Sequence, residues 1–304
     1  MDYTPYKLKH WINPDKMNWK LISLNPRAID IINDKILNGD SYLNWNGLSM
    51  NPNGPRILEN HIDKIEWDLL SRNPNAIKIL EKNKNKINWN LLSNNYNAIH
   101  LLEENQDKIN WVELSNNPNA IHLLEKNQDK IDWYWLSENP NAIHLLEENQ
   151  DKIHWPSLSG NKNAIHLLEN NQSKIDWVFL SGNINAINLL ENNIDKISWQ
   201  KLTVNPNAIN IISNNLDKIN WELLTLNPNA IHLLKKNQDK IDWYLFSKNQ
   251  CIFDLDYKKI EEKIIVFKED LIKKIYHPDK LWYYIEKYNY DIGSDEYIDY
   301  EYDN

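Results

Sequence analysis

Histidines recur at one place in a repeated pattern, and histidine is both the commonest metal ligand and the side chain that titrates near neutral pH. Four follow one another at 22-residue intervals, and a fifth stands three intervals later. They are His100, His122, His144, His166 and His232. Stacked helices would hold them about 8–10 Å apart, whereas two ligands of one zinc ion each lie about 2 Å from it. We therefore predict no metal site and favour a half-exposed structural role, with a pH-responsive surface as the alternative.

Lysines form a second column with the same spacing. Its members are Lys64, Lys86, Lys108, Lys130, Lys152, Lys174, Lys196, Lys218 and Lys240. Aspartates precede most of them, and glutamates stand near the end of each preceding apolar stretch. This alternation of sign predicts a solvated edge with salt bridges, each contributing about 0.2–1 kcal/mol. A nucleic-acid track would need unopposed lysines, and we keep it as the alternative function.

Carboxylate pairs such as Glu103-Glu104 and Glu147-Glu148 are the remaining candidates for acid–base chemistry. They belong to a copied polar segment without distinct pocket residues, so we interpret them as solvated. The sequence offers no glycine-rich phosphate loop and no Ser-His-Asp or Cys-His set. We predict no enzyme activity, no catalytic residue and no cofactor. Cys251 is the only cysteine, which excludes an intrachain disulfide and favours a reducing compartment.

The elements that position these columns follow from ten tryptophans spaced 22 residues apart. They are Trp45, Trp67, Trp89, Trp111, Trp133, Trp155, Trp177, Trp199, Trp221 and Trp243. A regular copy, residues 111–132, reads WVELSNNPNAIHLLEKNQDKID. Such a period indicates a repeat protein, in which each unit packs only on its neighbours. We predict that these tryptophans form the structural core of the repeats.

Each copy predicts two short helices. The first begins at the tryptophan after an Asn, Asp or Ser N-cap and ends before Asn-Pro, because the residue before proline is pushed out of the helical region. The second has that asparagine as N-cap and the proline in its first position. We expect it to end at an asparagine in the left-handed conformation, as at Asn105.

The asparagine of the Asn-Pro pair persists even where the proline is lost, as in Asn95-Tyr96. We predict that it forms a hydrogen-bonded turn ladder between stacked copies. The ladder residues are Asn51, Asn73, Asn95, Asn117, Asn139, Asn161, Asn183, Asn205 and Asn227, with Asn25 and Asn249 in the outermost copies.

Positions that differ between copies are less constrained by packing, and the two residues after the tryptophan vary most. Aromatic residues there are candidate binding anchors, because Trp and Tyr are enriched in interface hot spots. The alternative is that they fill a secondary core position. The candidate partner-binding residues are Tyr134, Trp135, Val178, Phe179 and Tyr244.

The predicted fold is an all-α, right-handed solenoid of about eleven two-helix repeats with a helical C-terminal cap. We divide the chain into an N-terminal cap (1–18), the solenoid (19–249), a C-terminal helical cap (250–290, with helix 257–275) and a mobile acidic tail (291–304). Stacked at helix spacing, the repeats would make a curved rod roughly 80–110 Å long.

The net charge of −9 argues against a general nucleic-acid or anionic-membrane binder. The N-terminus lacks the features of a signal peptide, and no stretch has about 18 apolar residues. We therefore expect a cytoplasmic protein without membrane contact or a small-molecule substrate. An extended repeat surface without chemistry predicts a non-enzymatic protein–protein interaction scaffold whose partner is a protein.

The copies W-x-x-L-S-x-N-P-N-A-I-x-L-L-E-x-N-x-D-K-I resemble repeat proteins of unknown function encoded in multiple paralogues by giant, mimivirus-like DNA viruses of amoebae. The resemblance covers residues 19–249, and the segment 276–280 is similar to tails of such proteins. It brings no catalytic residues. It implies a viral protein in the host cytoplasm that acts on host or viral proteins, and it is compatible with association with a virus particle.

Overall fold

The computed structural model describes residues 5–39 and 43–275, and also residues 277, 280, 282, 283, 285 and 287. The chain divides into two compact units. One comprises residues 6–254, and the other comprises residues 1–5 and 255–304. The predicted acidic tail, residues 291–304, lies outside the described residues. The predicted domain boundaries at residues 18, 249 and 290 stay a prediction.

The first helix of every repeat begins at a tryptophan, as predicted. These helices are α1 (Trp19–Ile22), α3 (Trp45–Met50), α5 (Trp67–Arg72), α7 (Trp89–Leu92), α9 (Trp111–Ser115), α11 (Trp133–Glu138), α13 (Trp155–Gly160), α15 (Trp177–Gly182), α17 (Trp199–Val204), α19 (Trp221–Leu224) and α21 (Trp243–Phe246). Most start at a side-chain cap, such as Asp132 Oδ1, which accepts from the Trp135 amide. Ser198, expected to be a good cap, makes no such bond.

The second helix starts later than predicted. Asn73 does form the expected N-cap and Pro74 the expected first position, but they belong to a 3-10 turn. The α-helix follows this turn and begins at Ile77. The second helices are α2 (Ile29–Leu37), α4 (Pro55–Leu58), α6 (Ile77–Lys82), α8 (Ile99–Glu104), α10 (Ile121–Glu125), α12 (Ile143–Glu148), α14 (Ile165–Asn170), α16 (Ile187–Glu191), α18 (Ile209–Ser213) and α20 (Ile231–Lys236). The other 3-10 turns after Asn are Pro26–Ala28, Pro206–Ala208, Pro228–Ala230 and Gln250–Ile252.

Most connectors that return the chain to the next tryptophan are also 3-10 turns. They are Pro14–Lys16, Ile62–Lys64, Lys84–Lys86, Gln106–Lys108, Gln128–Lys130, Gln150–Lys152, Gln172–Lys174, Ile194–Lys196 and Gln238–Lys240. The left-handed asparagine predicted before them is wrong, because Asn105 has a φ of −134°. Its side-chain amide donates to the Leu101 carbonyl at 2.9 Å, which satisfies a free helix-end oxygen without a left-handed residue.

One continuous apolar core runs through residues 6–254. In the copy that begins at Trp111, Leu114, Ala120 and Leu124 are completely buried, whereas the tryptophan itself is half-buried against them. A 22-residue copy cannot enclose these side chains alone, so each depends on its neighbours. These observations confirm the predicted all-α solenoid of two-helix repeats.

The first and last repeats join each other. The Asn25 side chain donates to the Asn249 carbonyl at 3.0 Å, and the Asn18 amide donates to Ser247 Oγ at 2.8 Å. Strand β1 (Tyr6–Leu8) pairs with β2 (Phe253–Leu255) beside them. Both hydrogen bonds are those made between consecutive repeats elsewhere, so residues 6–254 close into a ring.

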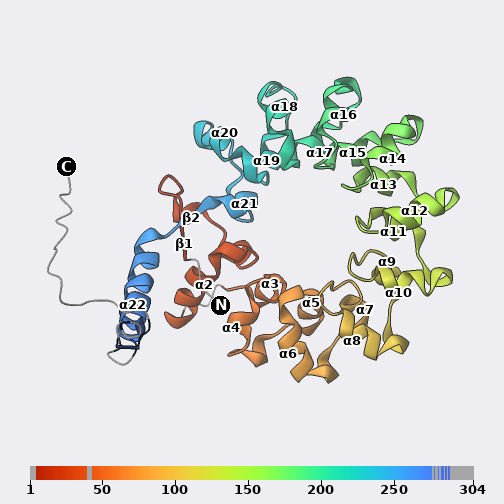
Figure 1. The fold of residues 1–304 in the computed structure, drawn as a ribbon. Helices are drawn as coiled ribbons and strands as arrows, with labels where there is room; N and C mark the ends of the chain where they lie inside the picture. Colours follow the sequence, from red (N-terminus) through yellow and green to blue (C-terminus); the bar gives the residue numbers. More distant parts are fainter. Residues whose placement is uncertain are drawn as a thin grey trace. The chain divides into compact units, whose positions relative to one another are not determined.

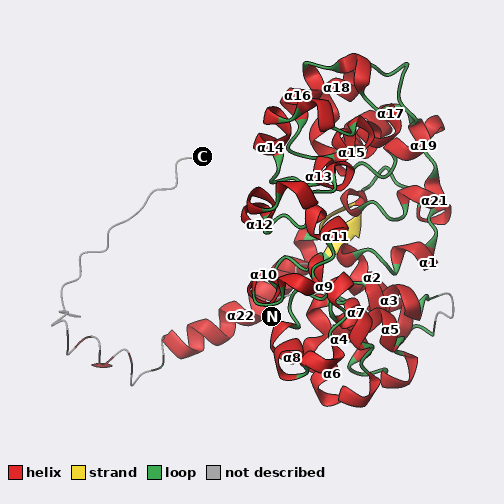
Figure 2. Cartoon of the chain, turned by 90° about the vertical axis from the view of Figure 1, so that its right-hand side faces the viewer, coloured by secondary structure: helices red, strands yellow, loops and turns green. Residues whose placement is uncertain are grey.

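The prediction of an open, curved rod roughly 80–110 Å long is therefore wrong, because the two ends of the repeat array meet. The sequence pattern shows how one repeat sits on the next but does not show the small rotation that accumulates over eleven of them. In Figure 1 the first helices form the inner layer of this unit and the second helices the outer layer. Figure 2 shows that helices and short connectors make up almost all of it, with the strand pair at one place.

In the other unit, α22 (Tyr257–Ile275) has the bounds predicted from the sequence. The Asp256 amide, just before it, donates to the Pro5 carbonyl at 2.9 Å. Within the described parts of the chain, no helix is long and apolar enough to cross a membrane.

Candidate functional site

Every first helix has one face that the repeat does not bury. Counting the tryptophan as position 1, positions 1, 4 and 5 lie on one side of a short helix and positions 2, 3 and 6 on the other. In α11, Leu136 and Ser137 at positions 4 and 5 are completely buried, while Tyr134 and Trp135 at positions 2 and 3 are exposed. We call positions 2, 3 and 6 the open face of the first helix, although Gly47 of α3 and Ser157 of α13 are buried at position 3.

Four of the five candidate partner-binding residues lie on the open faces of two first helices, α11 and α15, that are two repeats apart. Tyr134 and Trp135 lie on α11, and Val178 and Phe179 lie on α15, with 37–49% of their surfaces exposed. Helix α13 packs between α11 and α15. Together with Pro156 on α13, these residues form what we call the apolar sector. Trp135 is 37% and Phe179 40% exposed, so neither ring is fully enclosed, and whether they fill a secondary core position stays a prediction.

The rings of the apolar sector are held in place by one another and by small neighbours. The Tyr134 and Trp135 rings meet edge to face, with centroids 5.2 Å apart, and the Tyr134 ring lies 4.6 Å from the His154 ring. Ser157 on α13 is fully buried and donates to Glu138 Oε1 at 3.3 Å. A Cβ atom on Gly160 would lie 3.8 Å from the Phe179 ring, so that ring leans over the end of α13.

Tyr244, the fifth candidate, lies apart from the others on α21 and is 56% exposed. Sequence reasoning missed Val112, which is exposed on the open face of α9 beside α11. Its position, directly after Trp111, one of the tryptophans spaced 22 residues apart, is the signal that would have found it.

The asparagine ladder lies at the turn between the two helices of each repeat, as predicted. The fully buried Asn139 side chain donates to the Ser115 and Asn117 carbonyls of the preceding repeat, each at 3.0 Å. Its Oδ1 accepts from the Asn141 amide. These bonds use both donor hydrogens and one of the two acceptor lone pairs of the Asn139 side chain, which leaves one lone pair for a ligand.

Seven of the nine column lysines lie over tryptophans, a contact that the predicted salt-bridged edge did not include. Lys152 Nζ is 4.6 Å from the centre of the Trp133 ring, one repeat back, and Lys130 stands 4.4 Å from Trp111. An ammonium ion over an indole face is attracted by the ring quadrupole. Lys64 does form an ion pair, since its Nζ lies 3.1 Å from the Asp63 carboxylate. The hydrogen bond from Lys64 lowers the pKa of the exposed Asp63 carboxyl.

Four of the five column histidines pair with glutamates of the preceding repeats, whereas the residue at the glutamate's place before His232 is Ser213. His122 Nε2 lies 2.8 Å from Glu103 Oε1, and the same contact is made by three further pairs at 2.8–3.0 Å. These pairs are His100–Glu81, His144–Glu125 and His166–Glu147. Within the described part of the chain, no group of three His, Cys, Asp or Glu side chains could hold a metal ion.

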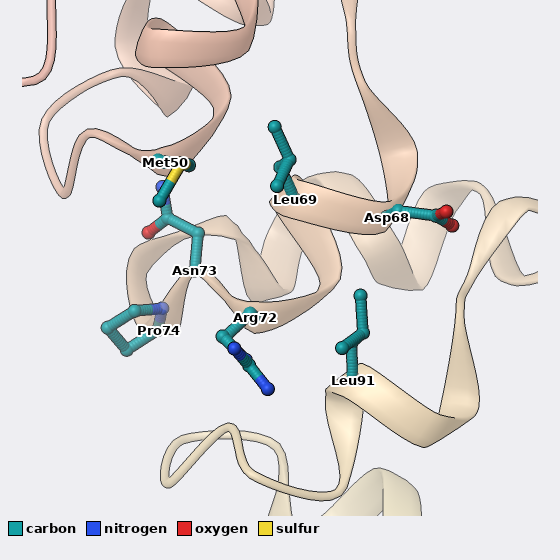
Figure 3. A pocket seen from close by; sticks show the side chains of 7 residues that line it. All are labelled: Met50, Asp68, Leu69, Arg72, Asn73, Pro74 and Leu91. Carbon is teal, nitrogen blue, oxygen red and sulfur yellow. The ribbon is translucent and has the colours of Figure 1, made fainter.

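A small apolar pocket lies where α3, α5 and α7 adjoin (Figure 3). Its lining residues are Met50, Asp68, Leu69, Arg72, Asn73, Pro74 and Leu91. Its volume of about 150 Å³ is well below the range of pockets that bind drug-sized ligands. Arg72 reaches past α7 to Glu113 of α9 at 3.0 Å, a contact that sequence reasoning missed although the chain has only three arginines.

Comparison with known proteins finds no family model, no curated protein and no solved structure that matches the chain. The described residues themselves therefore carry the functional argument.

Proposed function

We propose that this chain is a non-enzymatic scaffold that binds another protein through the open faces of its first helices. The observation that carries the proposal is the apolar sector, where large apolar side chains stay exposed on α11 and α15, the two helices that flank α13. Monomeric proteins rarely expose such side chains in contiguous groups, and aromatic residues are enriched in binding hot spots.

The lysine column supports nucleic-acid binding less well. Each ammonium that stacks on a tryptophan would have to leave the indole face, or share it, to reach a phosphate. The net charge of −9 opposes a polyanion as well. Retention on immobilised DNA at low salt would favour that alternative.

The resemblance to giant-virus repeat proteins adds a setting to the proposal: a viral protein in the cytoplasm of an amoebal host, acting on host or viral proteins. It rests on the repeat pattern alone.

Photo-crosslinking tests the proposal. A photoreactive amino acid in place of Tyr134 should give a protein adduct in host-cell lysate, and the same group in place of Lys78, exposed on α6, should not. Adducts of equal yield at both positions, or none at Tyr134, would contradict it.

A further inference from the structure

Most tryptophans of the repeats carry a cation that the chain itself supplies. Lys174 Nζ, for example, lies 4.3 Å from the centre of the Trp155 ring. A carboxylate on an open face is matched in the same way, since Arg72 lies 3.0 Å from Glu113. A cation over an indole face or beside an open-face carboxylate is therefore a recurrent contact in this protein.

The open face of α11 departs from this rule. Tyr134 and Trp135 are exposed there, and Glu138, one turn later on the same face, is half-buried. Within the described parts of the chain, no lysine or arginine lies over either ring or pairs with the Glu138 carboxylate. We call these three side chains the α11 corner.

The two rings of the α11 corner bound it on two sides. They stand at 83° to each other, with centroids 5.2 Å apart. In this edge-to-face arrangement, the face of the ring that stands on its edge is nearly perpendicular to the face of the other. Because the face of an aromatic ring attracts cations, the corner offers a cation two attractive walls.

The carboxylate is held on the same side of α11 as the Tyr134 ring. Glu138 follows Tyr134 by four residues, and residues at this spacing are neighbours on a helix surface. Both are directed at the start of α13, where the Tyr134 ring lies 4.6 Å from the ring of His154 and Glu138 Oε1 accepts from the Ser157 hydroxyl at 3.3 Å. The Ser157 amide in turn donates to His154 Nδ1 at 3.3 Å. One fully buried serine therefore anchors both neighbours of the corner.

Two rings beside a carboxylate match the chemistry of arginine. Its planar guanidinium stacks on aromatic faces and donates two parallel hydrogen bonds to a carboxylate, whereas a lysine ammonium is a compact, strongly hydrated charge. Ser157 occupies one acceptor site of Glu138, and a carboxylate has about four. Glu138 is also the one formally charged residue on the open faces of α11, α13 and α15, so no neighbouring open-face charge offsets it.

We infer that the α11 corner binds an arginine side chain of the partner protein. The guanidinium lies against the rings of Tyr134 and Trp135 and donates to the carboxylate of Glu138. This inference rests on the proposed protein-binding function and names the chemical group that the partner presents.

Fluorine NMR of the full-length protein labelled with fluorotryptophan tests the inference. The signal of Trp135 is assigned by its absence from Trp135→Phe, and Trp221, with Lys240 already 4.2 Å from its ring centre, is the internal control. The probe is N-acetylarginine amide. Its controls are N-acetyllysine amide and the uncharged N-acetylcitrulline amide, which has nearly the shape of the probe.

The arginine probe should shift the Trp135 signal saturably at millimolar concentration and leave the Trp221 signal in place. Its affinity should exceed that of the lysine probe by about threefold or more, and the citrulline probe should not bind. No shift at Trp135, equal shifts of the two signals, or equal affinities for the arginine and lysine probes would overturn the inference.

Variants place the binding at the corner. Glu138→Gln should weaken binding of the arginine probe about tenfold, since it removes the charge of the acceptor. Glu222→Gln is the matched control, an exposed glutamate on the open face of α19, and should leave the affinity within twofold. An unshifted Trp221 signal in both variants reports that the fold is kept, and equal losses of affinity would contradict the assignment.

The two proposals fail separately. A protein adduct at the photoreactive position 134, with no affinity of the unlabelled site for the arginine probe, rejects the arginine and keeps the scaffold. Binding of the arginine probe without any adduct contradicts the scaffold and keeps the corner as a guanidinium site.

Discussion

Asn139 shows how a single side chain joins three repeats. It donates to two carbonyls of the preceding repeat, accepts from the amide two residues later, and its own carbonyl accepts from Asn161 of the following repeat. All of these groups are buried or half-buried, so a lost partner leaves a polar group without water. Such a loss costs more than an exposed hydrogen bond contributes.

Asn139→Ala should therefore lower the free energy of unfolding by about 2–4 kcal/mol, since it strips partners from two carbonyls and one amide. Asn141→Ala is the matched control, because this exposed side chain makes one bond, to the Pro118 carbonyl at 2.8 Å. We expect it to cost about 1 kcal/mol or less. Urea denaturation measures both, and similar costs would show that the ladder is not structural.

Trp155→Ala and Trp135→Ala separate the two kinds of tryptophan. Trp155 packs against the core and beneath Lys174, so its removal should cost about 3 kcal/mol. Trp135 lies on the open face, and its removal should cost under about 1 kcal/mol. Thermal unfolding followed by circular dichroism gives both values, and the opposite order would place Trp135 in the core.

At the scale of the element, a buried serine ties each first helix to the next repeat. Ser115 Oγ donates to the Trp111 carbonyl at 2.7 Å and accepts from the Asp132 amide, the N-cap of α11, at 3.0 Å. One hydroxyl thus ends one helix and positions the start of another.

Ser115→Ala should cost about 1–3 kcal/mol, because the amide and the carbonyl stay buried without it. Ser115→Thr should cost less, since Thr203 keeps the donated bond at the equivalent place. The comparison is made by chemical denaturation. Equal losses in the two variants would mean that packing, and not the hydroxyl, decides the effect.

Helix starts could be predicted from the sequence because the tryptophan, its cap and the Asn-Pro pair are local signals. The later start of the second helix at Ile77 could not, since a 3-10 turn and an α-turn place proline in the same first position. The Lys152–Trp133 contact was also missed, because it joins two repeats and depends on their relative placement. The exposed candidates Trp135 and Phe179 were found because variation between copies marks positions that packing does not fix.

At the scale of the whole repeat unit, the junction between the last and the first repeat, which we call the seam, is built like any other repeat junction. The asparagine ladder passes from Asn249 to Asn25, and Lys16 stacks 4.9 Å above Trp243 in the manner of the other connector lysines. The seam adds the Trp11–Phe246 contact, with ring centres 6.0 Å apart. Closure removes both exposed apolar ends that an open solenoid has to cover.

Closure predicts that the repeat number is fixed. Deleting residues 133–154, one repeat, leaves ten repeats to close a ring that has eleven. Either the hydrogen bonds between the first and last repeats break, or the packing angle at every junction has to change. We expect a lower melting temperature and broader unfolding than for Asn141→Ala, measured by calorimetry. Unchanged melting would show that the ends are independent.

The most direct test of the closed ring is a spin-label distance across the seam. Labels are placed at Lys20→Cys and Tyr244→Cys in a Cys251→Ser background, at position 2 of the first and last repeats. The control pair is Glu222→Cys with Tyr244→Cys, at position 2 of two consecutive repeats. The ring predicts distance distributions for the two pairs that agree within a few ångströms, near the roughly 10 Å spacing of packed helices plus the label lengths. A seam distance approaching the roughly 80–110 Å of an open rod, with the control pair still close, would contradict it.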